Sequence, residues 1–244
     1  MLSGCNNSTK NDAATEQQKS DATLKPDTAI CTALIEKQLI LDDSVIALPK
    51  IKLTNKIAEQ KINAHFTLEN ITGYGLEEVK QQKEKFKQDS LPFGLTDLTF
   101  DVNYNKDCLL SLTFTIGTCG ASPSSYSTYY NFDLTTGDSI TYEKLLSAQK
   151  INELVQFCDK ILQKRISDAK KQDNCDEMIT AQLGGKKFTK ESLANFFITE
   201  NDFVFVYFFG FPHVILGAEP DGQIKISKIE MKKYLKENPY KLKL

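Results

Sequence analysis

The chain of 244 residues contains no tryptophan, only two histidines and a single arginine, Arg165. The other basic residues are all lysines, and 32 acidic residues leave a formal net charge of -2. Nucleic-acid interfaces are strongly basic, and they favour arginine for planar contacts with bases and phosphates. We therefore expect no nucleic-acid partner.

Long apolar stretches are also missing. The longest run, Phe203–Phe211, is nine residues, whereas a helix needs about 20 apolar residues to cross a bilayer. We expect no membrane span in this chain. With 41% hydrophobic and 25% charged residues, the composition is typical of a globular protein with one large domain or two small intertwined ones.

Metal-ligand spacing is absent as well. His65 and His213 lie far apart, and no Cys-x-x-Cys or His-x-x-x-His pattern occurs, so no zinc site is expected. Asp101–Asp107 has the alternating oxygen ligands of a calcium loop, but Lys106 stands where such a loop needs glycine. That alternation is typical of a strand with one wet face, and we expect neither a metal nor a cofactor.

The amino terminus carries the strongest short motif. Residues 2–5, Leu-Ser-Gly-Cys, have the form of a bacterial lipobox, although only Met1 stands where a signal peptide should precede it. Residues 6–27 are polar, with Leu24 as their one large apolar residue, and such a segment cannot bury enough surface to order itself. A frayed terminus with a chance cysteine is the alternative. We expect an envelope lipoprotein anchored to a membrane through acyl chains on Cys5, at a periplasmic or outer-membrane face.

The remaining cysteines leave several disulfide patterns open. Cys158 and Cys175 can pair only if the helix containing Cys158 ends by about residue 170. Cys108 and Cys119 are expected on one strand, roughly 36 Å apart, which is too far for a disulfide. Cys31 has no preferred partner, and the alternative is that all five are small buried hydrophobes.

Hydrophobic periodicity predicts an α+β protein with mainly antiparallel sheets packed against helices, preceded by a disordered tether. The expected strands cover residues 30–41, 45–53, 98–104, 110–116, 126–134, 196–198 and 203–209. The expected helices cover residues 55–67, 76–88 and 151–162, with a closing helix after the capping box Ser227–Glu230, and a small-residue loop covers 120–127. We divide the chain into a tether (1–28), an amino-terminal subdomain (29–125) and a carboxy-terminal subdomain (126–244) that pack as one unit.

No catalytic motif is complete. Gly120–Ser124 comes nearest to a nucleophile elbow but lacks the second glycine, and Gly184–Lys187 lacks the spacing of a phosphate loop. Paired carboxylates for glycoside hydrolysis leave no sequence signature. We expect no catalytic residue, and a peptidoglycan hydrolase that uses two carboxylates stays the alternative.

Two aromatic segments are candidate binding surfaces. Ser124–Tyr130 combines hydroxyls with rigid rings, including Tyr126 and Tyr129, a composition favoured in recognition surfaces. Tyrosines packed against neighbours on an edge strand would look the same. Phe209–Val214, with Phe211 and His213, is either a bend that ends a strand or an exposed aromatic patch.

The order of motifs resembles a bacterial envelope family, domain of unknown function 3298 (DUF3298). Asn131–Thr141 followed by Leu145-Leu146 is similar to its "nFDLkTGk-x-lTl-x-dLf" segment, and residues 203–235 are similar to its closing segment. Leu48–Ile51 with Lys61–Asn63 resembles the companion domain that usually precedes it. The family's "Y-x-gGAHg" loop is replaced here by residues 117–124, which lack its glycine pair and histidine.

Such modules occur outside the cytoplasm in peptidoglycan deacetylases of the PdaC type and in the anti-sigma factor RsiV, which binds lysozyme. The resemblance implies a PdaC-like binding module that faces the envelope. It makes a lysozyme-like protein or a cell-wall glycan the expected partner. A purely structural envelope protein is the remaining alternative.

Overall fold

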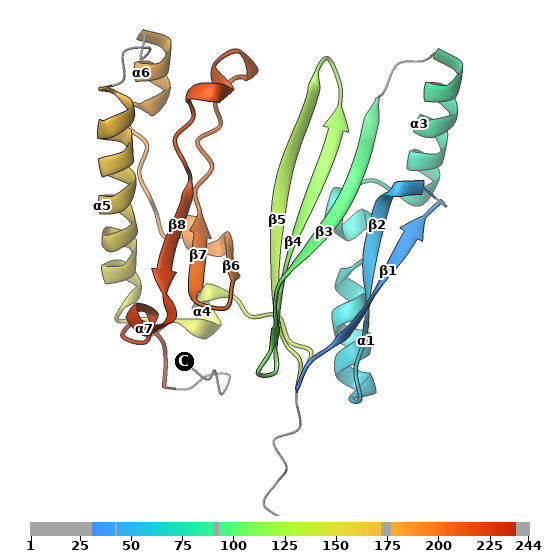
Figure 1. Cartoon of the computed structure of the whole chain (residues 1–244), viewed down its shortest axis with the longest axis horizontal. Coiled ribbons are helices and arrows are strands. Elements are labelled where there is room, and N and C mark those ends of the chain that lie inside the picture. Colours follow the sequence, from blue (N-terminus) through green and yellow to red (C-terminus); the bar gives the residue numbers. More distant parts are fainter. Residues whose placement is uncertain (1–30, 42, 90–92, 172–176, 238–244) are drawn as a thin grey trace, which may run out of the picture.

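The computed structural model describes residues 31–41, 43–89, 93–171 and 177–237. These residues form two sheets, mainly antiparallel, with helices packed against them (Figure 1). This confirms the α+β class. The lipobox, Cys5 and the tether lie outside the described residues.

The first sheet has the strand order β1-β2-β3-β4-β5. All neighbours are antiparallel except β2 and β3, which run parallel and pair only at Ile46 and Leu98. The parallel step arises because three helices connect these two strands. The strands are β1 (Leu34–Ile40), β2 (Asp43–Lys52), β3 (Gly94–Lys106), β4 (Leu109–Cys119) and β5 (Pro123–Asp133).

The connecting helices are α1 (Lys56–His65), α2 (Leu68–Thr72) and α3 (Leu76–Asp89). They cover one face of the first sheet (Figure 1). Alternate residues of β4 point into the core beneath them, and these are fully buried because strand side chains alternate between faces. They are Leu110, Leu112, Phe114 and Ile116.

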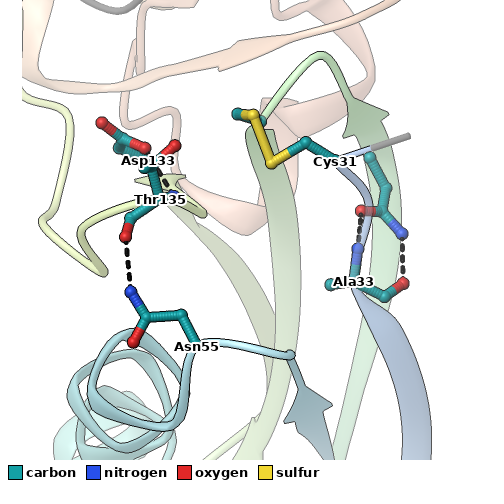
Figure 2. The surroundings of a disulfide bond; sticks show 7 residues. Cys31, Ala33, Asn55, Asp133 and Thr135 are labelled. Carbon is teal, nitrogen blue, oxygen red and sulfur yellow. Dashed lines mark hydrogen bonds between the residues drawn. A yellow bond between two sulfur atoms is a disulfide. The ribbon is translucent and has the colours of Figure 1, made fainter. Parts of the chain in front are cut away.

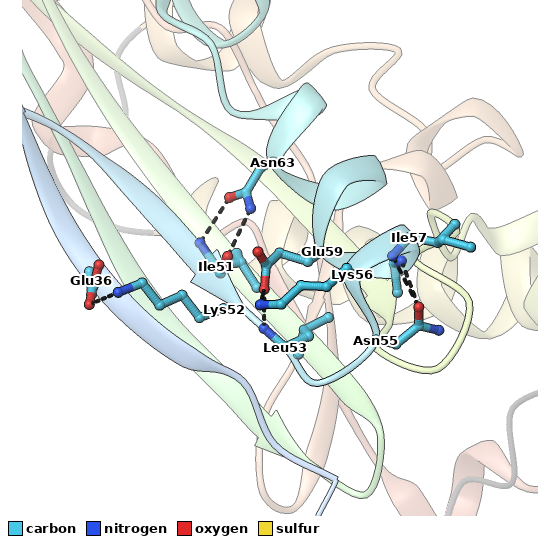
Figure 3. Close-up of polar contacts among 10 residues, drawn as sticks. Glu36, Ile51, Lys52, Leu53, Asn55, Lys56, Ile57, Glu59 and Asn63 are labelled. Atoms are coloured by element: carbon cyan, nitrogen blue, oxygen red, sulfur yellow. Dashed lines mark hydrogen bonds and ion pairs between the residues drawn. The ribbon is translucent and has the colours of Figure 1, made fainter.

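Polar side chains hold α1 in place. Asn55 caps the helix by accepting hydrogen bonds from the backbone amides of Ile57 and Ala58, at 3.1 and 3.3 Å. The Asn63 side chain forms two 2.8 Å hydrogen bonds with the backbone of Ile51 in β2 (Figure 3). These bonds pin the helix to the strand that precedes it.

The second half contains the antiparallel sheet β6-β7-β8 and its own helices. The long helix α5 packs against this sheet through one apolar face (Figure 1), as its periodicity predicts. The elements are α4 (Tyr142–Leu145), α5 (Ile151–Ala169), α6 (Glu177–Leu183), the 3-10 helix η1 (Glu191–Ala194), β6 (Phe196–Ile198), β7 (Asp202–Val206), the 3-10 helix η2 (His213–Ala218), β8 (Gln223–Ser227) and α7 (Lys228–Met231).

The two halves meet where β6 lies against β4 and β5. Asn131 donates a 2.9 Å hydrogen bond from its side chain to the carbonyl of Phe196, and the Ser111 hydroxyl accepts one of 2.9 Å from the amide of Ile198. Tyr104 and Leu109 of the first sheet belong to the core of the second half. The expected boundary at residue 126 falls inside β5, which is paired with β4 throughout.

One disulfide joins Cys31, just before β1, to Cys108 in the turn between β3 and β4 (Figure 2). The backbone amide of Cys108 also bonds to the carbonyl of Cys31 at 3.0 Å. Next to it, the Asn105 side chain forms two 2.8 Å bonds with the backbone of Ala33. The start of the first sheet is therefore fastened to the β3–β4 turn covalently and by hydrogen bonds.

The expected Cys158–Cys175 pairing involves one residue that the structure describes, Cys158. Helix α5 does end at Ala169, as that pairing required, but Cys158 is a free thiol buried in the core. Cys175 lies outside the described residues. Burial raises the pKa of Cys158 to about 12, so it behaves as a small hydrophobe.

Several expected elements need correction. The loop expected over residues 120–127 is shorter, because β5 begins at Pro123 and pairs there with Cys119. An edge strand with exposed residues lacks the apolar alternation on which the prediction depended. The strand expected to run to Phe209 ends at Val206, and the periodicity did not predict β8, α2, α6, η1 or η2.

Candidate functional site: a tyrosine-lined cavity between the halves

A cavity of about 320 Å³ lies at the edge of β5, where the first sheet meets the second half. We call it the junction cavity. Three consecutive residues of β5 form one wall, and the segment that leads into α4 forms another. The lining residues are Tyr129, Tyr130, Asn131, Ser139, Ile140, Thr141, Tyr142, Glu143, Ala194 and Phe196.

Asn131 is the most informative residue of this lining. It is only 5% exposed, and its side-chain amide is occupied by the bond to the carbonyl of Phe196. Its Oδ1 atom is buried and has no hydrogen-bond donor among the described residues. Buried polar atoms are nearly always paired, so this oxygen is an exception, but it has less than 1 Å² of accessible surface and does not face a ligand in the cavity.

Tyr129 supplies an aromatic surface beside Asn131. Its ring stacks on that of Phe197, with centroids 5.5 Å apart and an interplanar angle of 20°. Burial raises the pKa of the Tyr129 hydroxyl, and a hydrogen bond with Ser127 opposes that effect only in part. The hydroxyl therefore stays protonated at neutral pH.

Glu143 adds a carboxylate to the lining. Burial by itself raises its pKa, but hydrogen bonds from the Thr141 and Tyr142 side chains, with the charge of Lys190, hold that pKa below its ordinary value. Burial and the bond to Glu143 raise the pKa of Tyr142. At neutral pH the cavity thus contains one ionised carboxylate beside neutral tyrosines.

This combination suits a small polar ring more than a metal or an anion. Sites for small molecules are mostly apolar, with a few polar groups that fix orientation. Here the apolar part is aromatic, and the polar part that the described residues supply comprises hydroxyls and a single carboxylate. All of these atoms can accept hydrogen bonds, and the hydroxyls can also donate.

The structure separates the two tyrosines that the sequence placed together. Tyr129 pairs with Thr113 and faces the second half, whereas Tyr126 pairs with Ile116 and lies on the face that the helices cover. Tyr126 is 41% exposed. Burial and the nearby Tyr74 raise its pKa. The segment Ser124–Tyr130 is therefore not one continuous recognition surface.

The second aromatic segment is mainly core. Phe211 is 7% exposed and packs edge-to-face on Phe209, so it does not form an exposed patch. His213 is the first residue of η2 and is not among the residues that line the junction cavity, and its side chain lies outside what the structure describes. The exposed ring of this region is Phe208, at 75%.

A second cavity of about 290 Å³ lies between α3 and the start of β3. Its walls include the exposed side chains of Val45, Phe86 and Phe93. We favour the junction cavity because its lining combines aromatic rings with the carboxylate of Glu143. Within the described residues, no cluster of three or more metal-binding side chains occurs, and no helix there is long and apolar enough to span a membrane.

Sequence reasoning identified Tyr129 but missed Asn131, Tyr142 and Glu143. These residues flank or belong to the Asn131–Thr141 segment, which the sequence singled out only as a family resemblance. Their role depends on β6 and η1, which arrive from 50 or more residues later in the chain. The family-like segment was the one available signal, and it did not indicate a cavity.

Comparison with solved structures identifies the fold. A DUF3298 family member from Bacteroides fragilis NCTC 9343 matches with a TM-score of 0.51 and 17% identity over 85% of this chain and 92% of that one. Another from Pseudomonas aeruginosa PAO1 has a TM-score of 0.48 and 13% identity over 85% and 94%. No family model and no curated protein matches the sequence. The shared fold agrees with the DUF3298 resemblance. It supports neither a PdaC-type companion domain nor lysozyme binding.

Proposed function

We propose that this chain, which shares the fold of a DUF3298 family member, is a noncatalytic binding module of the cell envelope that holds cell-wall glycan in the junction cavity. The observation that carries the proposal is the pairing, in one lining, of the stacked aromatic ring of Tyr129 with the ionised carboxylate of Glu143. N-acetylated sugars offer hydroxyls and an amide N–H to a carboxylate, and an apolar ring face to an aromatic side chain. A cavity of about 320 Å³ has room for a sugar unit.

The Cys31–Cys108 disulfide supports a location outside the cytoplasm. Disulfides persist in oxidising compartments such as the periplasm and are rare in the reducing cytosol. The lipobox-like sequence ending at Cys5 points the same way. We therefore propose an envelope lipoprotein with its lipid on Cys5.

The charge state of Glu143 favours binding over hydrolysis. Glycosidases use two carboxyl groups, one of which stays protonated so that it can donate to the leaving group. Glu143 is the only carboxylate that the described residues place in the lining, and its pKa is lowered. An ionised Glu143 accepts hydrogen bonds from sugar hydroxyls but is poorly suited to act as an acid.

Calorimetric titration of the protein with N-acetylglucosamine oligomers and solubilised peptidoglycan fragments tests the proposal. We expect Tyr129→Ala and Glu143→Gln each to weaken binding about tenfold, equivalent to about 1.4 kcal/mol. Tyr126→Ala is the matched control, because that tyrosine lies on the other face of the same strand, and it should leave affinity unchanged. Equal losses in all three variants would contradict a site in the junction cavity.

Lysozyme is the competing partner, and the same preparation distinguishes it. Protein immobilised on a support should retain glycan fragments and let lysozyme pass. Retention of lysozyme with no affinity for glycan would replace the proposal with protein binding.

The lipid anchor has its own test. Mass spectrometry of the protein from native membranes should find a diacylglyceryl group on Cys5, and a bare cysteine in the soluble fraction would refute the anchor.

A further inference from the structure

Strand β5 is an edge of the first sheet. Among the described residues, its carboxy-terminal end is covered by another segment of the chain. The carbonyl of Asn131 accepts a 2.7 Å hydrogen bond from the amide of Ile140, and the amide of Asp133 donates one of 3.0 Å to the carbonyl of Asp138. Phe132 and Ser139 form an antiparallel bridge. The chain itself thus adds a short extended segment along this part of the edge.

The same side of β5 is unpaired nearer the amino-terminal end of the strand, within the described residues. Because backbone groups alternate along a strand, the amides and carbonyls of Ser125, Ser127 and Tyr129 point the same way as those of Asn131, away from β4. Within the described ranges, no other strand pairs with them. We call this stretch, Ser125–Tyr129, the free edge.

Between Ser125 and Tyr129 the free edge has neither charged side chains nor a bulge, two features that protect edge strands, and the proline at the start of β5, Pro123, lies two residues before it. Residues 123–130 contain no charged residue, and the register of β5 on β4 is unbroken from Asp133 to Pro123. The opposite edge of the sheet differs: β1 carries Glu36 and Lys37 and has a register shift at Leu39/Ile40. The edge formed by β1 is therefore protected against pairing with another strand, and the free edge of β5 is not.

We propose that the free edge binds an extended segment of a partner polypeptide, which pairs with β5 as an added strand. The segment is uncharged and rich in β-branched or aromatic residues, because its neighbours on the two faces would be Tyr126 and Thr128 on one and Ser127 and Tyr129 on the other. A single strand suits the position better than a second copy of the chain. The second half of the molecule lies beside this edge (Figure 1), and a second copy would have to bring its own second half to the same place.

A synthetic peptide with the sequence of β4, residues 109–119 with serine for the final cysteine, is a suitable probe. It is uncharged, and its sequence already pairs with the inner side of β5. Excess peptide added to the full chain should slow hydrogen exchange at the amides of Ser125, Ser127 and Tyr129 at least tenfold, as followed by NMR. Unchanged exchange at these amides would overturn the proposal.

Ser127→Pro should abolish this protection, because it removes an outward N–H that plays no part in pairing with β4. Ser127→Ala is its control and should retain protection. If Ser127→Pro alters the fold, a peptide N-methylated at alternate residues replaces it, and undiminished protection by that peptide would count against strand pairing.

Dimerisation without peptide, seen by light scattering, would also overturn the proposal by making a second copy the occupant. Glu143→Gln should leave peptide binding intact, so this proposal and glycan binding can fail separately.

Discussion

The two halves of this molecule are held together by different means. The first sheet is fastened at its start by the Cys31–Cys108 disulfide and by paired hydrogen bonds from Asn105 and Asn63. The second half has no disulfide among its described residues and instead buries a dense cluster of phenylalanines around β6 and β7. Both sheets bury a core under helices, but a covalent bond near the start of the chain is a feature of the first sheet alone among the described residues.

The halves nevertheless share one boundary. Tyr104 and Leu109 extend from the first sheet into the core of the second half. Two buried polar side chains, Ser111 and Asn131, fix the contact between them. We therefore expect the halves to unfold together, although they are stabilised differently.

The largest expected effect is in the second core. Phe205 is fully buried, and Phe205→Ala should lower the free energy of unfolding by about 3–5 kcal/mol. Phe208→Ala, which removes an exposed ring just after the same strand, should change it by less than about 0.5 kcal/mol. Calorimetry should show a single transition that shifts as a whole. Two transitions, of which only one moves, would show that the halves are independent.

Removal of the disulfide should have the next largest effect, on the first half. The bond closes a loop of 77 residues, and Cys31→Ser with Cys108→Ser should cost about 2–4 kcal/mol, mainly by enlarging the unfolded ensemble. Urea denaturation measures it. Reductant should destabilise the unaltered protein and leave the double variant unchanged; equal unfolding of the unaltered protein with and without reductant would contradict the role of the bond.

A smaller effect is expected at the boundary. Ser111→Ala leaves the amide of Ile198 without its acceptor, which should cost about 1–3 kcal/mol. Ser124→Ala is the control, since its exposed hydroxyl contacts only that of Thr118 at 3.0 Å, and the expected change is within about 0.5 kcal/mol. If both variants unfold at the same urea concentration, the polar contact does not stabilise the boundary.

The smallest effect concerns pH and the first half. The Glu59 carboxylate accepts hydrogen bonds from Lys56 and from the amide of Leu53, both at 2.7 Å (Figure 3), and these lower its pKa from 4.5. Its contribution to stability is therefore present above pH 4.5 and is lost as the pH falls through the lowered value.

NMR titration should find the Glu59 pKa below that of an unfolded peptide, and Glu59→Gln should make stability less sensitive to acid in this range. A normal Glu59 pKa would show that the bonds do not favour the ionised form.

Local sequence patterns predicted much of the first half. Alternation in residues 98–104 and 110–116 predicted the β3–β4 hairpin, and the four-residue spacing of Ala58, Ile62 and Phe66 predicted α1. These succeed because each element buries one face and leaves the other wet. The start of β5 was missed because its first residues are exposed on both sides.

By itself, the sequence determined the α+β class, the amphipathic face of α5 and the aromatic residues of the sheet on which α5 packs. These features depend on the spacing of neighbouring residues. Only the tertiary structure decided that Cys31 pairs with Cys108, that Tyr126 and Tyr129 lie on opposite faces, and that Tyr129 and Glu143 line one cavity. Those outcomes depend on strand register and on segments brought together from distant parts of the chain, and no local pattern records such distances.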